Sequence, residues 1–125
     1  MRRFLELTAA IEAATGLALI AAPNAVVRLL LGEEISGAAI PLGRVAGVAL
    51  LALGVACWLA SREGQSSGRS LVRAMLLYNC GVALVLAANG LGIASAGVGL
   101  ALWPAVAVHA VMAFWSVRIQ AQRPI

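Results

Sequence analysis

Four apolar runs, each close to the length of a membrane span and almost free of charge, constrain this chain more than any other feature. They cover about residues 4–22, 40–60, 71–88 and 99–117. A helix needs about 20 apolar residues to cross the hydrocarbon core of a bilayer, so each run predicts one transmembrane helix. The composition agrees, because 62% of the 125 residues are hydrophobic and 11% are charged. A chain this short cannot bury such an excess in a water-soluble core. We therefore expect one lipid-embedded domain over residues 1–125.

The breaks between the runs predict how the helices connect. Residues 24–31 are apolar around a single charge, Arg28, and the flanking Pro23 and Gly32 are typical of a helix start and a helix end. We expect a short helix there, lying in the membrane interface. Residues 61–69 are polar and predict a flexible connector between two helical hairpins. Together these features predict an all-α, antiparallel four-helix membrane bundle with a short interfacial helix between its first two spans.

The arginines are distributed unevenly between the two sides of this bundle. Seven fall on the side of the termini and the polar connector: Arg2, Arg3, Arg62, Arg69, Arg73, Arg118 and Arg123. Only Arg28 and Arg44 fall toward the other side. Cytoplasmic loops are enriched in Lys and Arg, so we expect both termini and residues 62–70 to be cytoplasmic. Glu6 and Glu12 interrupt the first apolar run, so we expect it to remain as a span rather than to be cleaved as a signal peptide.

Small residues predict which helix faces meet, because helices in lipid approach closely where side chains are small. On the second span one stripe carries Gly43, Gly47, Gly54, Cys57 and Ser61. On the first span one face carries Thr8, Glu12, Thr15 and Gly16, and on the fourth one face carries Ala105, His109, Met112, Ala113 and Ser116. We expect these faces to line the interior.

Three polar residues lie at about the same depth, near the middle of three different spans. They are Glu12, Asn79 and His109, and Tyr78 adjoins Asn79. A polar or ionisable group at the bilayer centre is costly without a partner, so such residues face inward and often mark function. Glu12 and His109 could share a proton and bind protons or an organic cation, with Asn79 and Tyr78 in support. The alternative is a neutral hydrogen-bonded cluster, with Glu12 protonated, that fixes the helix register.

Charged residues near the ends of the spans form a second group of candidates. Arg44 lies just inside the outer end of the second span, where it could pair with Glu33 or Glu34, hold an anion, or extend to the headgroups. Glu6 and Arg73 both lie at the inner ends of their spans, and we expect an ion pair between them.

The sequence offers no catalytic constellation. Phosphate-binding loops, nucleophile elbows and zinc-protease motifs are missing from it. Cys57 and Cys80 stand alone in apolar runs, which predicts neither a disulfide nor a metal site. We therefore expect no enzyme activity, no metal and no cofactor. The charges are too sparse and scattered for a nucleic-acid groove.

One part of the chain resembles a known family. Leu5-Glu6 through Gly16 and Pro23 form an acidic first helix, residues 26–32 follow, and Gly43-Arg44-Val-Ala-Gly47 opens an apolar run to Trp58. This stretch, about residues 5–58, resembles the small bacterial DoxX-like four-helix membrane proteins. The resemblance implies the four-helix fold and a bacterial inner membrane. It carries over no catalytic residue, since that group is mostly of unknown function, with loose links to quinone-related redox complexes.

Three functions remain open at this point. The leading hypothesis is a small membrane protein that acts through helix–helix association, as a homo-oligomer or as an accessory subunit of a larger membrane complex. The alternative is a proton-coupled transporter or conduit that uses Glu12, His109, Asn79 and Tyr78. The second alternative is a quinone- or haem-associated redox subunit, although a single His cannot supply both axial ligands of a haem within one chain.

Overall fold

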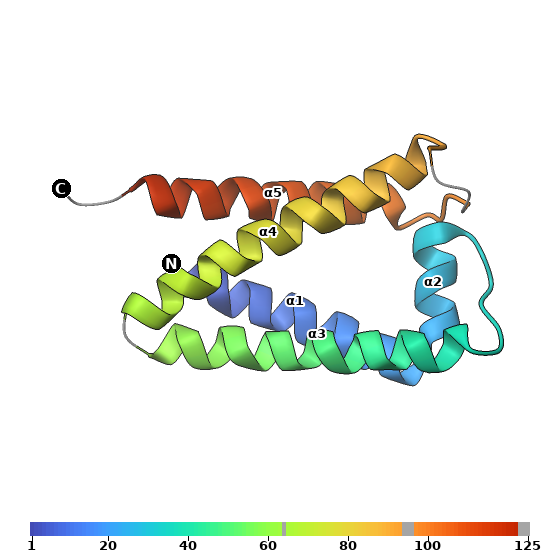
Figure 1. Cartoon of the computed structure of the whole chain (residues 1–125), viewed down its shortest axis with the longest axis horizontal. Helices are drawn as coiled ribbons and strands as arrows, with labels where there is room; N and C mark the ends of the chain where they lie inside the picture. The colour runs from blue at the N-terminus through green and yellow to red at the C-terminus, as the bar shows by residue number, and fades with distance from the viewer. Residues whose placement is uncertain (64, 94–96, 123–125) are drawn as a thin grey trace.

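The computed structural model describes the chain except for residue 64, residues 94–96 and residues 123–125. Arg123, one of the arginines used to predict orientation, therefore lies outside the described residues. The described part forms five helices: α1 (Arg2–Ala21), α2 (Pro23–Leu31), α3 (Ala39–Arg62), α4 (Gln65–Gly90) and α5 (Leu102–Ala121). The four long helices run antiparallel (Figure 1), and each is long and apolar enough to cross a membrane. The predicted all-α fold, with a short helix between the first two spans, is confirmed.

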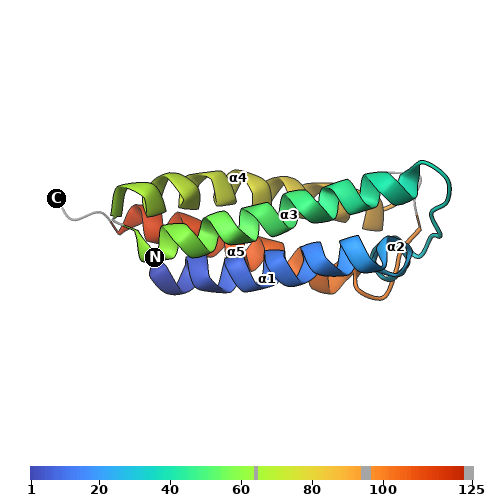
Figure 2. The same ribbon diagram turned by 90° about the horizontal axis from the view of Figure 1, so that it is seen from below.

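The long helices are arranged as two pairs. Contacts between elements are concentrated where α1 packs on α3 and where α4 packs on α5, while few residues connect one pair to the other. In Figure 1 the α4–α5 pair lies above the α1–α3 pair, and α4 crosses its partner α5 obliquely. Figure 2 shows α1 and α3 lying side by side along most of their length. The two pairs correspond to the two hairpins expected from the sequence.

Glycines allow α1 and α3 to approach each other closely. A Cβ atom placed on Gly16 would lie 2.6 Å from the carbonyl oxygen of Gly47, and one on Gly54 would lie 2.9 Å from the backbone nitrogen of Ala13. The backbones therefore meet with no side chain between them, which is how small residues stabilise helix pairs in lipid. Gly47 and Gly54 belong to the small-residue stripe noted on this helix.

All four long helices meet in one apolar core near the end of the bundle that carries Arg2, Arg62 and Arg69, called here the basic end. Buried residues of this core are Phe4, Leu5, Ala9, Cys57, Ala60, Val72, Met75 and Met112. The ring of Phe4 packs edge-on against Trp115, with ring centroids 5.6 Å apart. This core fixes α1 against α5 across the two pairs.

At the opposite end, called here the α2 end, α2 lies across the bundle and ties the two pairs together (Figure 1). Pro23 begins this helix, and Gly32 ends it in the left-handed conformation, with φ 71°. The backbone N–H groups of Gly99 and Ala101 donate to the carbonyls of Leu30 and Leu29, at 3.0 and 2.8 Å. Two backbone hydrogen bonds thus link α2 to the segment that leads into α5.

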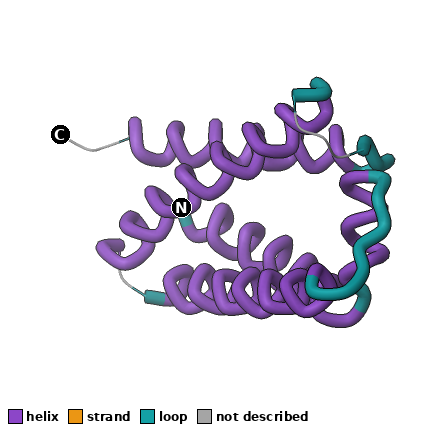
Figure 3. Tube along the Cα trace, turned by 45° about the vertical axis from the view of Figure 1, so that its right-hand side comes forward, coloured by secondary structure: helices purple, strands orange, loops and turns teal. Residues whose placement is uncertain are grey.

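The polar connector is shorter than the sequence predicted. We expected residues 61–69 to form a flexible loop and the third span to begin near residue 71, but α4 already begins at Gln65. Backbone hydrogen bonds form a helix whether or not its side chains are apolar, so α4 can extend beyond the apolar run that was expected to cross the membrane. Gly68 also packs against Met1, since a Cβ there would lie 2.8 Å from the Met1 methyl carbon. Figure 3 shows the described loops at the two ends of the bundle.

Candidate functional site

The three polar residues of the middle layer lie inside the bundle. Glu12 of α1 and Asn79 of α4 are 3% and 2% exposed, and His109 of α5 is half-buried. The prediction that they face the interior is confirmed for Glu12 and Asn79, and the half-buried His109 is bonded to Asn79. Whether they bind a proton or a substrate stays a prediction.

Tyr78 connects α4 to α1 at this layer. Its hydroxyl donates a hydrogen bond of 2.9 Å to Oε2 of Glu12. The two residues are 66 positions apart in the sequence and belong to different helix pairs. This bond is therefore a direct polar link across the boundary between the two helix pairs, called here the seam. At this depth few other polar groups compete for the hydrogen bond.

Asn79 connects α4 to α5 on the other side. Its Nδ2 donates to the carbonyl oxygen of Met75 at 2.7 Å, and its Oδ1 lies 2.8 Å from Nδ1 of His109. A carbonyl only accepts, so the amide orientation is set, and an amide oxygen facing Nδ1 requires that this nitrogen carry the hydrogen. In the neutral imidazole Nε2 is then the basic nitrogen. Among the described residues nothing is hydrogen-bonded to Nε2.

The sequence left open whether Glu12 and His109 share a proton directly. These two side chains do not hydrogen-bond to each other in the described structure. Tyr78 of α4 bonds to Glu12 and packs its ring against His109, so it lies between the acid and the imidazole. The rings of Tyr78 and His109 pack edge-on, with centroids 5.7 Å apart. The layer thus consists of two hydrogen-bonded units, Glu12–Tyr78 and His109–Asn79, joined by a ring contact. Tyr78, which the sequence suggested only as a supporting residue, is the bridge.

The expected ion pair between Glu6 and Arg73 is corrected. Glu6 accepts a hydrogen bond of 2.8 Å from Nε of Arg2, while Arg73 is exposed on α4. Arg2 lies one helical turn before Glu6 on the same face, so this pair forms without any contact between helices.

Arg44 takes none of the acidic partners considered for it. Glu34 instead lies 3.3 Å from Nη1 of Arg28, and Arg44 is exposed near the start of α3. The reason is local: the turn after α2 returns residue 34 over the helix that carries Arg28. That Arg44 contacts lipid headgroups or an anion stays a prediction.

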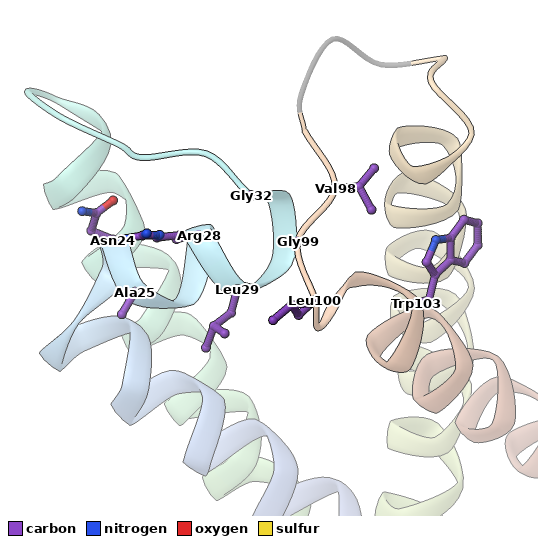
Figure 4. A pocket seen from close by; sticks show the side chains of 9 residues that line it. All are labelled: Asn24, Ala25, Arg28, Leu29, Gly32, Val98, Gly99, Leu100 and Trp103. Atoms are coloured by element: carbon purple, nitrogen blue, oxygen red, sulfur yellow. The ribbon is translucent and has the colours of Figure 1, made fainter.

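A pocket at the α2 end was not expected from the sequence. It has a volume of about 810 Å³ and is formed by one face of α2 and the segment leading into α5 (Figure 4). Arg28 and Trp103 both line it. The apolar character around Arg28 was the only available signal, since the contact between residues 29–32 and 97–101 arises from tertiary packing.

The described residues offer no metal centre. No group of three His, Cys, Asp or Glu side chains comes together in the part of the chain that the structure describes. Cys57 is buried and Cys80 is exposed, and both are free thiols. The groups at the middle layer that can exchange protons are Glu12, Tyr78 and His109, and the chemistry that this arrangement supports is proton binding and release.

No protein-family model, curated protein or solved structure matches the chain. Its class therefore follows from the fold. With four helices able to cross a membrane and a fifth lying across one end of the bundle, the chain is a multi-pass membrane protein in contact with the lipid bilayer.

Proposed function

We propose that this protein is a proton-coupled transporter or conduit, with Glu12 as the group that binds and releases the proton. The observation that carries the proposal is the bond from Glu12 to Tyr78, which lies at the seam between the two helix pairs. This is the second of the hypotheses drawn from the sequence, and the geometry favours it over simple association. The proposal includes no covalent chemistry.

A charge inside a bilayer is energetically costly. An ionised carboxylate at the bilayer centre costs at least about 3 kcal/mol. In the described structure Tyr78 is the side chain that bonds Glu12, and no arginine is paired with it. Such a carboxyl group loses its proton readily only when water or a cation reaches it. Proton release is therefore coupled to opening of the site or to arrival of a cation.

Glu12 lies between the two helix pairs, where movement of one pair against the other could open the site. Few residues connect the two helix pairs, so a small movement of one pair against the other breaks few contacts. Transporters commonly bind their substrates near the bilayer midplane between units that move against each other. His109, with its basic Nε2, adds a second proton acceptor on the far side of Tyr78.

The experiment is a proton-flux assay in proteoliposomes with a pH-sensitive dye inside the vesicles. Glu12→Gln keeps the shape of the side chain but cannot ionise, and we expect it to abolish flux. Glu6→Gln is the matched control, because Glu6 is an acid on the same helix that pairs with Arg2 near the basic end. Flux that persists in Glu12→Gln, or that is lost equally in both variants, would contradict the proposal. So would a wild-type protein that moves no protons under any imposed gradient.

The second candidate is association with another copy of the chain through α4. On this helix Leu77 and Leu84 are 78% and 70% exposed, and between them Gly81 has no other group within 4 Å of where its Cβ would be. A second helix could approach closely there.

Cys80, exposed beside Gly81, allows a direct test of association. A membrane-permeant bis-maleimide should cross-link wild-type chains into dimers, and Cys80→Ser should remove the product. Cys57→Ser, at the buried thiol, is the control and should cross-link as the wild type does. Cross-linking that does not depend on Cys80 would exclude this surface.

A further inference from the structure

The pocket at the α2 end has the features of a binding site. Ala25, Arg28, Leu29 and Gly32 are spaced so that they share one face of α2, and this face forms one wall. The other wall is formed by Val98, Gly99, Leu100 and Trp103 (Figure 4). The two backbone hydrogen bonds from Gly99 and Ala101 to α2 hold the walls together. The site is therefore formed before any ligand arrives.

The walls of this pocket expose large apolar side chains. Leu100 is 92% exposed and Leu29 is 53% exposed. Figure 4 shows these two residues between Arg28 on one side and Trp103 on the other. Trp103 is held in place by the end of α4, since a Cβ on Gly90 would lie 2.8 Å from its indole ring. The pocket thus combines an apolar floor with a fixed aromatic ring.

Arg28 supplies a positive charge at one edge of this floor. Its side chain is 70% exposed, and its partner Glu34, 3.3 Å away, is 68% exposed. An ion pair so open to solvent is weak, so the guanidinium remains available to a second anion. Arginine binds phosphate well, because its planar fork of N–H donors matches two phosphate oxygens.

The location of the pocket indicates the kind of ligand. Helix α2 lies across the end of a bundle of membrane-spanning helices, where the headgroups of a bilayer are found (Figure 1). Tryptophan rings prefer this depth as well. A soluble anion would leave Leu29 and Leu100 uncovered, and an uncharged hydrocarbon chain would leave Arg28 with Glu34 alone.

We propose that this pocket binds a phospholipid from the leaflet at the α2 end, with its phosphate against Arg28 and an acyl chain across Leu29 and Leu100 toward Trp103. The proposal is independent of the proton site at Glu12, which lies on other residues in the middle layer. Each can fail without the other.

The test is a titration of delipidated protein in detergent with phosphatidylglycerol, followed by native mass spectrometry. We expect the wild type to bind the added lipid. We expect Arg28→Gln to weaken this binding about tenfold, because a hydrogen bond to a charged group is lost. Arg44→Gln is the matched control, because Arg44 is another exposed arginine near the same end of the bundle but does not line the pocket. Leu100→Gln, which alters the floor without touching the charge, should also weaken binding.

Three outcomes would overturn the proposal. Equal binding by Arg28→Gln and Arg44→Gln would remove the role of the pocket arginine. Equal binding of a diacylglycerol, which has no phosphate, would show that the headgroup is not recognised. Displacement of the lipid by inorganic phosphate at similar concentration would show a site for a soluble anion instead. Thermal unfolding of each variant verifies that the protein is folded.

Discussion

At the scale of single residues, the middle layer depends on how each buried polar atom finds a partner. In the described chain no buried side-chain nitrogen or oxygen lacks one. Glu12 is bonded by Tyr78, and Asn79 lies between the Met75 carbonyl and the His109 ring. Because unpaired polar groups are costly in a bilayer, loss of one member leaves its partner exposed to that cost.

Tyr78→Phe tests the bond across the seam. The variant keeps the ring against His109 but removes the hydroxyl that donates to Glu12. We expect the free energy of unfolding in detergent to fall by about 1–3 kcal/mol, the cost of leaving a buried acceptor unpaired. The measurement is equilibrium unfolding followed by circular dichroism.

The control for this variant is Thr8→Val. The Thr8 hydroxyl is also buried, but it donates to the Phe4 carbonyl one turn earlier on its own helix. Its loss removes no contact between helices, so the effect should be clearly smaller. Equal losses in Tyr78→Phe and Thr8→Val would show that the link to Glu12 contributes nothing specific.

At the scale of helices, the contacts within each helix pair differ from the contacts between the two pairs. Within the α1–α3 pair, backbones touch at glycines along the length of the contact. Between the pairs, the contacts among the described residues include the core at the basic end, the polar layer and the hydrogen bonds of α2 to the segment before α5. The helices therefore pack more extensively within each pair than between the pairs.

Gly16→Ala tests the close approach of α1 and α3. The new methyl group would lie 2.6 Å from the Gly47 carbonyl oxygen and 2.7 Å from the Leu51 nitrogen, and backbone atoms there cannot move aside. We expect destabilisation of about 1–3 kcal/mol, as for other overpacked contacts. Melting temperature in a defined detergent provides the measurement.

Gly81→Ala is the matched control, since it adds the same methyl group to a helix where nothing lies within 4 Å. Alanine is the better helix former, so in the monomeric chain in detergent, where no second copy packs on Gly81, this variant should be neutral or slightly more stable. If Gly16→Ala proved as harmless as Gly81→Ala, the helices would be less closely packed than described.

At the scale of the whole molecule, the two ends of the bundle differ both in charge and in structure. The basic end carries the arginines of the N-terminal segment and of the α3–α4 connection, and the α2 end carries the short helix α2 with Glu33 and Glu34 after it. We expect the basic end to face the cytoplasm, because arginine-rich segments are retained there.

Cysteine labelling tests this orientation. In a background of Cys57→Ser and Cys80→Ser, Glu33→Cys places a thiol at the α2 end and Glu63→Cys places one at the basic end; both native side chains are exposed. A membrane-impermeant maleimide added to intact bacterial cells should label the Glu33→Cys protein, and should label the Glu63→Cys protein only after the membrane is opened. The reverse pattern would show that the bundle is inserted the other way round.

Some features of the site could be predicted from local sequence because they depend on local geometry alone. Helix rise fixes the depth of Glu12, Asn79 and His109 within their spans whatever the packing. The i, i+3 and i+4 spacing fixes which neighbours share a face, and so predicted the inward faces of α1 and α5. On α4, by contrast, Asn79 lies inward while the small residues Cys80 and Gly81 are exposed. The short helix at residues 24–31 followed from its own Pro and Gly boundaries.

Which residues bond to which was decided only by the tertiary structure. Every long helix carries small residues, so their stripes do not specify which helices pair or in what order they surround the axis. The packing that forms brings Tyr78 of α4, not His109 of α5, against Glu12, although α1 and α5 also touch through Phe4 and Trp115. Likewise, the pocket exists because residues 97–101 fold back onto α2. Sequence determined the helices, their depth and their inward faces, because these follow from short-range geometry; the partners required contacts between residues far apart in the chain.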